Sequence, residues 1–134
     1  MMSTYNRNAS VGNFENVINL EALKYLFEPY VVFMYGSTVT RIKTNKRKIQ
    51  SDIDLLIIID DRKKMSISIL KRNYMLNKFC NITNVYLDAI WLSKSEFEKL
   101  LINEEFRSFL RDCVPVYVGD VKWFKEILNL SKSY

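Results

Sequence analysis

The sequence predicts an α/β domain built on a small mixed sheet that is flanked by helices. Short apolar runs of strand length alternate along the chain with longer segments whose apolar residues recur at helical spacing. The chain has 134 residues, which gives room for one domain with one core. Hydrophobic residues make up 49% of the sequence, so a packed interior can form.

The first part of the chain is expected to contain a loose terminus, a helix and a strand. Residues 1–12 are polar and unpatterned, and the folded domain is expected to span residues 13–134. Apolar residues near helical spacing predict a helix, unbroken or with one break, over residues 14–27, before Pro29. Residues 31–35 are continuously apolar and are predicted to be the first strand.

The middle of the chain predicts two further strands separated by a helix. A helix is expected to begin after Ser37, and residues 52–60 are predicted to be the second strand because residues 55–59 are continuously apolar. The sequence leaves open whether this strand follows the first through a crossover or a hairpin. Residues 65–79 carry a helical apolar stripe, and residues 85–92 form the third strand-like run.

The last part of the chain predicts a helix, a strand and a final helix. Ser93 or Ser95 can cap a helix whose apolar face drifts but continues to Cys113. Residues 114–118 are predicted to be the fourth strand. Residues 121–130 are predicted to form the last helix, because their apolar residues recur at helical spacing.

The composition excludes several kinds of active site. The chain contains no histidine, which rules out Ser-His-Asp and Cys-His catalysis and most zinc sites. Carboxylate, lysine and tyrosine side chains remain as candidate proton acceptors. Cys80 and Cys113 lie among apolar neighbours, which suits reduced core thiols better than a disulfide or a metal site.

The net charge indicates the class of binding partner, and the hydropathy pattern indicates the expected cellular location. The net charge of +5 and the isoelectric point near 9.2 favour polyanionic partners such as nucleotides, RNA or an acidic protein face. The apolar runs are far shorter than the ~20 residues that a membrane helix needs, and the N-terminus has no signal-like apolar stretch. We therefore expect a cytoplasmic protein without membrane association.

Two acidic residues stand at the leading end of the second predicted strand. Asp52 and Asp54 are two residues apart, so on a strand their side chains project to the same side while Ile53 points into the core. Carboxylates beside a strand that is buried on both faces are costly unless their charge is compensated. The pair therefore predicts a site for a divalent cation, with Mg²⁺ as the expected ion.

A glycine and a serine follow the first predicted strand. Gly36 lets the backbone approach a ligand closely, and the amides and hydroxyl at Ser37, where a helix is expected to begin, attract an anion. A phosphate site facing a carboxylate pair predicts a metal-bound nucleoside triphosphate as ligand. Tyr35 is interpreted as a core-edge aromatic residue, although a tyrosine hydroxyl near the site could itself accept a nucleotide.

These residues resemble the pattern of the DNA polymerase β-like nucleotidyltransferase superfamily. That pattern has Gly-Ser after a strand, Asp-x-Asp on the next strand and a third acid on a later strand. The matching residues here are Gly36, Ser37, Asp52, Asp54 and Asp88. The short chain looks like the minimal nucleotidyltransferases of bacteria and archaea over residues 31–119, which implies a single-domain nucleotidyltransferase fold.

The resemblance also implies roles for individual residues. Asp52, Asp54 and Asp88 would be the catalytic residues and the ligands of two Mg²⁺ ions, with ATP as substrate. The nucleotide-binding residues that it implies are Gly36, Ser37, Thr38 and Arg41. In the family the segment after Gly-Ser commonly runs x-Ala-Arg-Gly, whereas Arg41 stands one position later here and the glycine is absent.

The spacer between Gly-Ser and Asp-x-Asp is longer and more basic than in the resembling family. Its cations are either solvated surface or a binding site for the acceptor, and both interpretations stay open. The candidate acceptor-binding residues are Lys43, Lys46, Arg47 and Lys48.

The function implied by the resemblance is Mg²⁺-dependent transfer of a nucleoside monophosphate, AMP from ATP in the simplest case, to a hydroxyl group. Minimal nucleotidyltransferases are often encoded beside HEPN-type RNase toxins, which implies an antitoxin that modifies a tyrosine of its partner toxin. Two alternatives stay open. One is a toxin that adds nucleotides to an RNA or tRNA 3′ end, and the other is a non-catalytic antitoxin or phage-encoded inhibitor that acts by binding.

Overall fold

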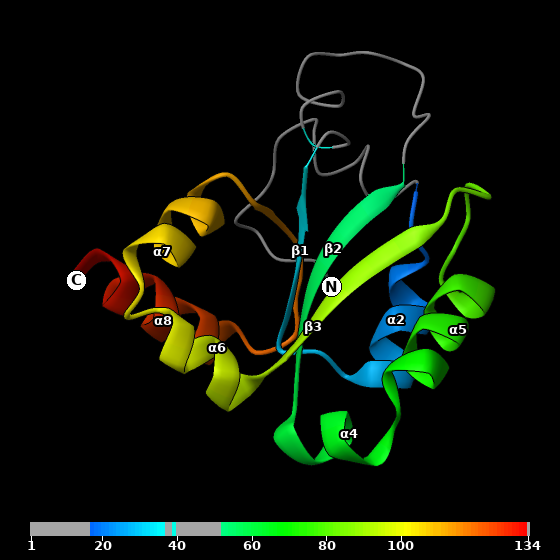
Figure 1. Ribbon diagram of the computed structural model, residues 1–134, viewed down its shortest axis with the longest axis horizontal. Coiled ribbons are helices and arrows are strands. Elements are labelled where there is room, and N and C mark those ends of the chain that lie inside the picture. The colour runs from blue at the N-terminus through cyan, green and yellow to red at the C-terminus, as the bar shows by residue number, and fades with distance from the viewer. Residues whose placement is uncertain (1–16, 37–38, 40–51, 134) are drawn as a thin grey trace.

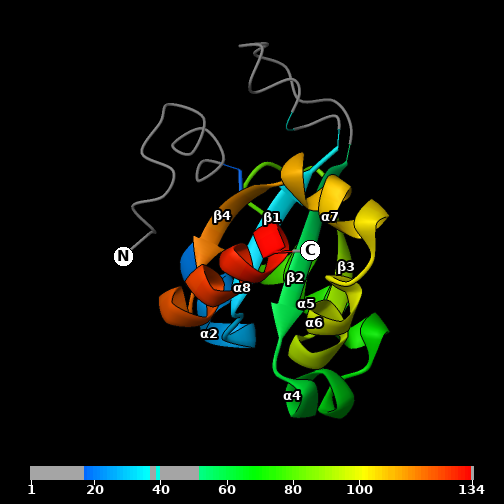
Figure 2. The same ribbon diagram turned by 90° about the vertical axis from the view of Figure 1, so that its left-hand side faces the viewer.

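In the part of the chain that the structure describes, the fold is a four-stranded mixed sheet with helices on both faces (Figures 1 and 2). The computed structural model describes residues 17–36, 39 and 52–133. Its elements are α2 (Leu20–Phe27), β1 (Val31–Tyr35), β2 (Ile53–Ile59), α4 (Asp61–Ser66), α5 (Ile69–Phe79), β3 (Leu87–Ser93), α6 (Lys94–Leu100), α7 (Glu104–Arg111), β4 (Val114–Val118) and α8 (Val121–Ser133). The predicted class, an α/β fold with a small mixed sheet flanked by helices, is confirmed.

The strand order across the sheet is β3-β2-β1-β4. β1 pairs antiparallel with β2 and with β4, whereas β3 pairs parallel with β2. The pairing that the sequence left open between the first two strands is therefore antiparallel. Because β3 runs parallel to β2, the starts of these two strands lie at the same end of the sheet as the end of β1 (Figure 1).

Each face of the sheet covers its own apolar core. Leu55 and Ile57 pack in the core beneath α2 and α5, whereas Leu56 and Ile58 pack in the core beneath α6 and α8. This alternation follows from the period of two along a strand. It also explains why residues 55–59 read as a continuous apolar run, because both sides of β2 are buried.

The core beneath α6 and α8 is built on aromatic rings. Phe97 of α6 is fully buried, and its ring lies 6.2 Å from that of Phe33 on β1 and 5.7 Å from that of Trp123 on α8. Phe106 of α7 meets Phe97 edge-on at 5.6 Å. These contacts hold three helices against one face of the sheet.

Two predicted helices are each split in the structure, so their expected extent was wrong. The segment 65–79 divides into α4 and α5 because Ser68 caps a new helix, with its side chain accepting the amide hydrogen of Lys71. The helix expected from Ser93 toward Cys113 divides into α6 and α7, because Asn103 caps α7 in the same way. A capping side chain satisfies a first-turn amide and so favours a fresh start over continuation.

The boundaries of the remaining elements agree closely with the sequence, apart from the first helix. α2 begins at Leu20, where Asn19 caps it, and within the described residues Ile18 instead forms an isolated bridge with Asn81. The helix ends before Pro29 as expected, through Glu28 in the left-handed conformation. The expected helix after Ser37 lies almost wholly outside the described residues.

The two cysteines agree with the expectation of reduced core thiols. Cys80 and Cys113 are both buried and neither forms a disulfide. Burial raises the pKa of the Cys80 thiol to about 12, so it stays protonated at neutral pH. In the part of the chain that the structure describes, no helix combines the length and the apolar character needed to cross a membrane.

Replacing the ring at the centre of the aromatic core should be costly. We expect Phe97→Ala to lower the free energy of unfolding by about 3–5 kcal/mol, because a fully buried ring with several ring neighbours leaves a cavity. Ile102→Ala is the control, since Ile102 is 69% exposed. Urea denaturation of both variants measures the difference, and a Phe97→Ala cost no larger than the control would contradict this packing.

Candidate active site

A row of three side chains crosses the sheet at one end. Asp54 on β2 is the Cα partner of Asp88 on β3 and of Tyr35 on β1. Asp54 lies two residues before Leu56, and Tyr35 two residues after Phe33, so by alternation both face the core beneath α6 and α8. The parallel register places Asp88 on that same side. The row therefore runs Asp88, Asp54, Tyr35 along one face.

The acids of this row lie close enough to repel one another. Asp54 is half-buried, whereas Asp52, one residue before β2, and Asp88 are exposed. Burial raises the pKa of Asp54, and the charges of Asp88 and then Asp52 raise it further. A bound cation would reverse this electrostatic cost.

Tyr35 completes the row with a neutral hydroxyl group. Burial raises the pKa of Tyr35 to about 12, with smaller contributions from Asp54, Asp88 and Cys113. Its ring meets Phe109 of α7 edge-on, with 5.0 Å between the ring centroids. At neutral pH the phenol is therefore protonated and its ring is fixed against a helix.

Gly36 brings the backbone against the central carboxylate. Its φ of +82° lies in the left-handed region, where side chains other than hydrogen are strained. A Cβ added at this position would lie 2.6 Å from the Oδ2 atom of Asp54. Both the backbone conformation and the space therefore require glycine at the turn that leaves β1.

The structure gathers part of the predicted site. Gly36, Asp52, Asp54 and Asp88 lie at one end of the sheet. The other predicted nucleotide-binding and acceptor-binding residues lie outside the described residues and stay predictions: Ser37, Thr38, Arg41, Lys43, Lys46, Arg47 and Lys48. Sequence reasoning did not place Tyr35 in the site. The sequence did contain a signal for this placement, because Tyr35 directly precedes Gly36 and lies two residues after Phe33 on the same strand.

The chemistry of the acids suits a hard divalent cation. Mg²⁺ prefers carboxylate oxygens, and Asp54 and Asp88 occupy partnered positions on adjacent strands. Within residues 17–36, 39 and 52–133, however, no three or more His, Cys, Asp or Glu side chains are grouped closely enough to hold a metal ion. Joint coordination by the three aspartates would thus require side-chain rotation.

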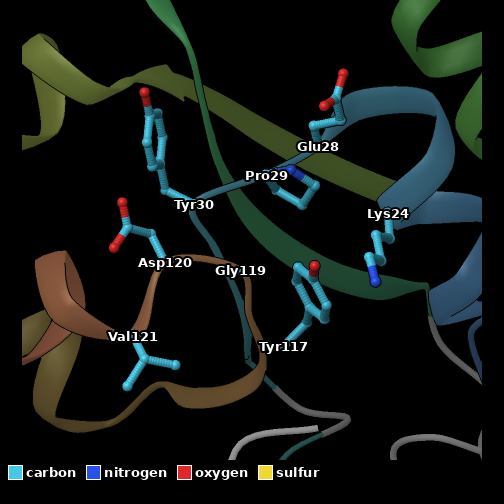
Figure 3. A pocket seen from close by; sticks show the side chains of 8 residues that line it. All are labelled: Lys24, Glu28, Pro29, Tyr30, Tyr117, Gly119, Asp120 and Val121. Carbon is cyan, nitrogen blue, oxygen red and sulfur yellow. The ribbon is translucent and has the colours of Figure 1, made fainter. Parts of the chain in front are cut away.

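A separate cavity lies at the opposite end of the sheet (Figure 3). It has a volume of about 430 Å³ and lies where β1 begins and β4 ends. Tyr30, Tyr117 and Lys24 are among the residues that line it. Asp120 also lines it, and its carboxylate accepts a hydrogen bond from the backbone amide of Trp123 in the first turn of α8. Of the predicted site residues that the structure describes, Gly36, Asp52, Asp54 and Asp88, none lines this cavity.

Comparisons with known proteins give one structural likeness. No family model matches the sequence, and no curated protein matches it at a significant level. The chain is similar to a crystal structure of a proposed nucleotidyltransferase from Sulfolobus solfataricus, with 19% sequence identity and a TM-score of 0.38. The similarity covers 83% of this chain and 89% of that chain.

Replacing Gly36 should destabilise the fold, and a double-mutant cycle with Asp54 can measure how much of the cost comes from the clash between the two residues. We expect Gly36→Ala to lower the free energy of unfolding by at least about 1 kcal/mol, from the left-handed backbone conformation and the clash with Asp54. In an Asp54→Ala background the clash is removed, so Gly36→Ala should cost less. Equal costs in both backgrounds, measured by urea denaturation, would show that the two residues do not meet.

The raised pKa of Asp54 predicts a stability change with a definite sign. A carboxyl whose pKa is higher in the folded state contributes stability below its unfolded pKa and loses it as the pH rises. Asp54→Asn should therefore raise the melting temperature at pH 7, by about 1–4 °C in the presence of EDTA, and the gain should vanish near pH 3.

Asp61 is the matched control of opposite sign. Hydrogen bonds from Ser95 lower the pKa of Asp61, so its contribution to stability is present at neutral pH and is lost as the pH falls. Asp61→Asn should lower the melting temperature at pH 7 and have little effect at low pH. Thermal scans of both variants between pH 3 and pH 8 make the test, and a destabilised Asp54→Asn at pH 7 would contradict it.

Proposed function

We propose that the protein is a Mg²⁺-dependent nucleotidyltransferase that moves a nucleoside monophosphate, AMP from ATP, onto a hydroxyl group and releases pyrophosphate. The observation that carries this proposal is the in-register pair of Asp54 and Asp88 on adjacent strands, with the Gly36 backbone packed against the Asp54 carboxylate. Phosphoryl transfer needs little covalent chemistry from a protein, but it needs positioning and charge stabilisation.

In the proposed reaction the aspartates would hold the metal ion, and Asp88 and Gly36 would orient the acceptor hydroxyl and the phosphates. Asp52, Asp54 and Asp88 are the residues that would bind Mg²⁺, which when bound neutralises charge on the phosphates. Asp88, at the exposed edge of the row, also orients the acceptor hydroxyl and takes its proton as the new ester bond forms. The amide at Gly36, together with the predicted residues that follow it, binds the phosphates.

The acceptor that we propose is a tyrosine hydroxyl of a HEPN-type toxin, so that the protein acts as an antitoxin. Support comes from the resemblance of the sequence motif to minimal nucleotidyltransferases. A second candidate is an RNA or tRNA 3′ end, which the net charge of +5 and the four cations of the spacer favour.

The activity should depend on the carboxylates. We expect the double variant Asp52→Asn with Asp54→Asn to lose transfer by at least about 100-fold, because it removes charges that hold the metal-bound triphosphate. Asp61→Asn is the control, since Asp61 bonds to Ser95 at the far end of β2. The assay is incorporation of α-labelled ATP into a co-encoded toxin or into total tRNA.

Each acceptor gives a distinct result. Label in the toxin supports the antitoxin proposal, and label in tRNA supports the second candidate. If the protein neutralises the toxin without transferring label, and the double variant does so equally well, the acids are idle and binding alone acts. That outcome would overturn the enzymatic proposal.

A further inference from the structure

Tyr35 occupies a defined place beside the proposed catalytic carboxylates. It is the last residue of β1, and its Cα partner is Asp54, whose other partner is Asp88. Asp54 therefore separates Tyr35 from Asp88 along the row. The side chain of Tyr35 is half-buried and lies on the same face of the sheet as the two acids.

The ring of Tyr35 is anchored from behind by helix α7. It meets Phe109 edge-on at 5.0 Å, Phe109 lies 6.0 Å from Phe106, and Phe106 meets the fully buried Phe97. This chain of rings connects Tyr35 to the aromatic core. The contact with Phe109 involves the ring, so it leaves the hydroxyl group for another role.

The order of the row indicates which part of a substrate the hydroxyl group would meet. Tyr35 directly precedes Gly36, where the proposed function places the phosphates, and it is separated by Asp54 from Asp88, where the acceptor is oriented. A carboxylate can only accept hydrogen bonds, whereas a phenol can donate one. Phosphate oxygens are strong hydrogen-bond acceptors. The Tyr35 hydroxyl, which can donate, therefore lies at the end of the row where the phosphates are proposed to bind.

We propose that the Tyr35 hydroxyl group donates a hydrogen bond to a phosphate oxygen of the bound nucleoside triphosphate. Tyr35 is then a nucleotide-binding residue, and Phe109 is the positioning residue that fixes its ring. This inference rests on the proposed function, because it needs a triphosphate at Gly36.

The substitution Tyr35→Phe tests the inference without disturbing the ring packing. Because a hydrogen bond to a charged group is removed, we expect the Kd for Mg·ATP to rise about 10-fold or more. The melting temperature should stay that of the parent, since the contact with Phe109 is kept. Isothermal titration calorimetry with Mg·ATP measures the affinity directly and does not depend on the acceptor.

Tyr74→Phe is the matched control. Tyr74 is 59% exposed on α5, which packs on the other face of the sheet, and its hydroxyl accepts a hydrogen bond from Lys78. Tyr74→Phe also removes a phenolic oxygen, but from a site far from the row, so it should leave the Kd for Mg·ATP unchanged. Phe109→Leu should weaken binding to a smaller extent, because it loosens the ring while keeping the hydroxyl group.

The outcomes separate the inference from the proposed function. If the parent binds Mg·ATP and Tyr35→Phe binds it equally well, Tyr35 is a packing residue and the inference is wrong, while the proposed function stands. If the parent does not bind Mg·ATP, the proposed function fails and the inference fails with it. Weaker binding by Tyr35→Phe, with Tyr74→Phe unchanged, supports the assignment.

Discussion

The parallel register between β2 and β3 is the constraint on which the site depends. It pairs Asp54 with Asp88, so that two like charges occupy neighbouring positions on one face of the sheet. Burial, and then the charge of Asp88, raises the pKa of Asp54, so the charged pair is unfavourable by itself. A register shifted by one residue would turn Asp88 to the opposite face and bury its charge against the core of α2 and α5. The cores on both faces therefore fix the register, and the register fixes the site.

The rest of the structure supports this arrangement from both sides. β2 is buried on both faces, so a slip of one residue would move its two sets of apolar side chains into each other's core and carry the Asp54 carboxylate into the core beneath α2 and α5. β1 brings Tyr35 and Gly36 to the same end of the sheet, where the glycine leaves room for the Asp54 carboxylate. The site is thus positioned by rigid strands, which suits the geometric precision that phosphoryl transfer requires.

The sequence predicted the strands well because each is an apolar run bounded by polar residues. Residues 31–35 and 114–118 have the predicted limits, and Asp54 lies at the leading end of the second strand as expected. Asp88 lies on the third strand as expected, but nearer its start, because β3 begins at Leu87 and not at residue 85. The splits at Ser68 and Asn103 were missed, because a capping side chain in the middle of an apolar stripe is a weaker signal than the stripe.

The cross-strand contacts could not be predicted from periodicity. The neighbourhood of Tyr35 and Asp54 depends on which residues pair between antiparallel strands, and single-strand patterns do not contain that information. Alternation along β1 does predict that the Tyr35 side chain lies on the same face of the sheet as Phe33.

Mapping where a divalent cation binds tests directly whether Asp54 and Asp88 form the metal site. Mn²⁺ accepts the same oxygen ligands as Mg²⁺ and broadens the NMR signals of nearby nuclei. In a titration with Mn²⁺ and ATP, we expect the amide signals of Gly36, Asp54 and Asp88 to broaden first, while those of Asp60 and Asp120 at the opposite end stay sharp. Preferential broadening around Asp60 or Asp120, with sharp signals at Asp54 and Asp88, would contradict it.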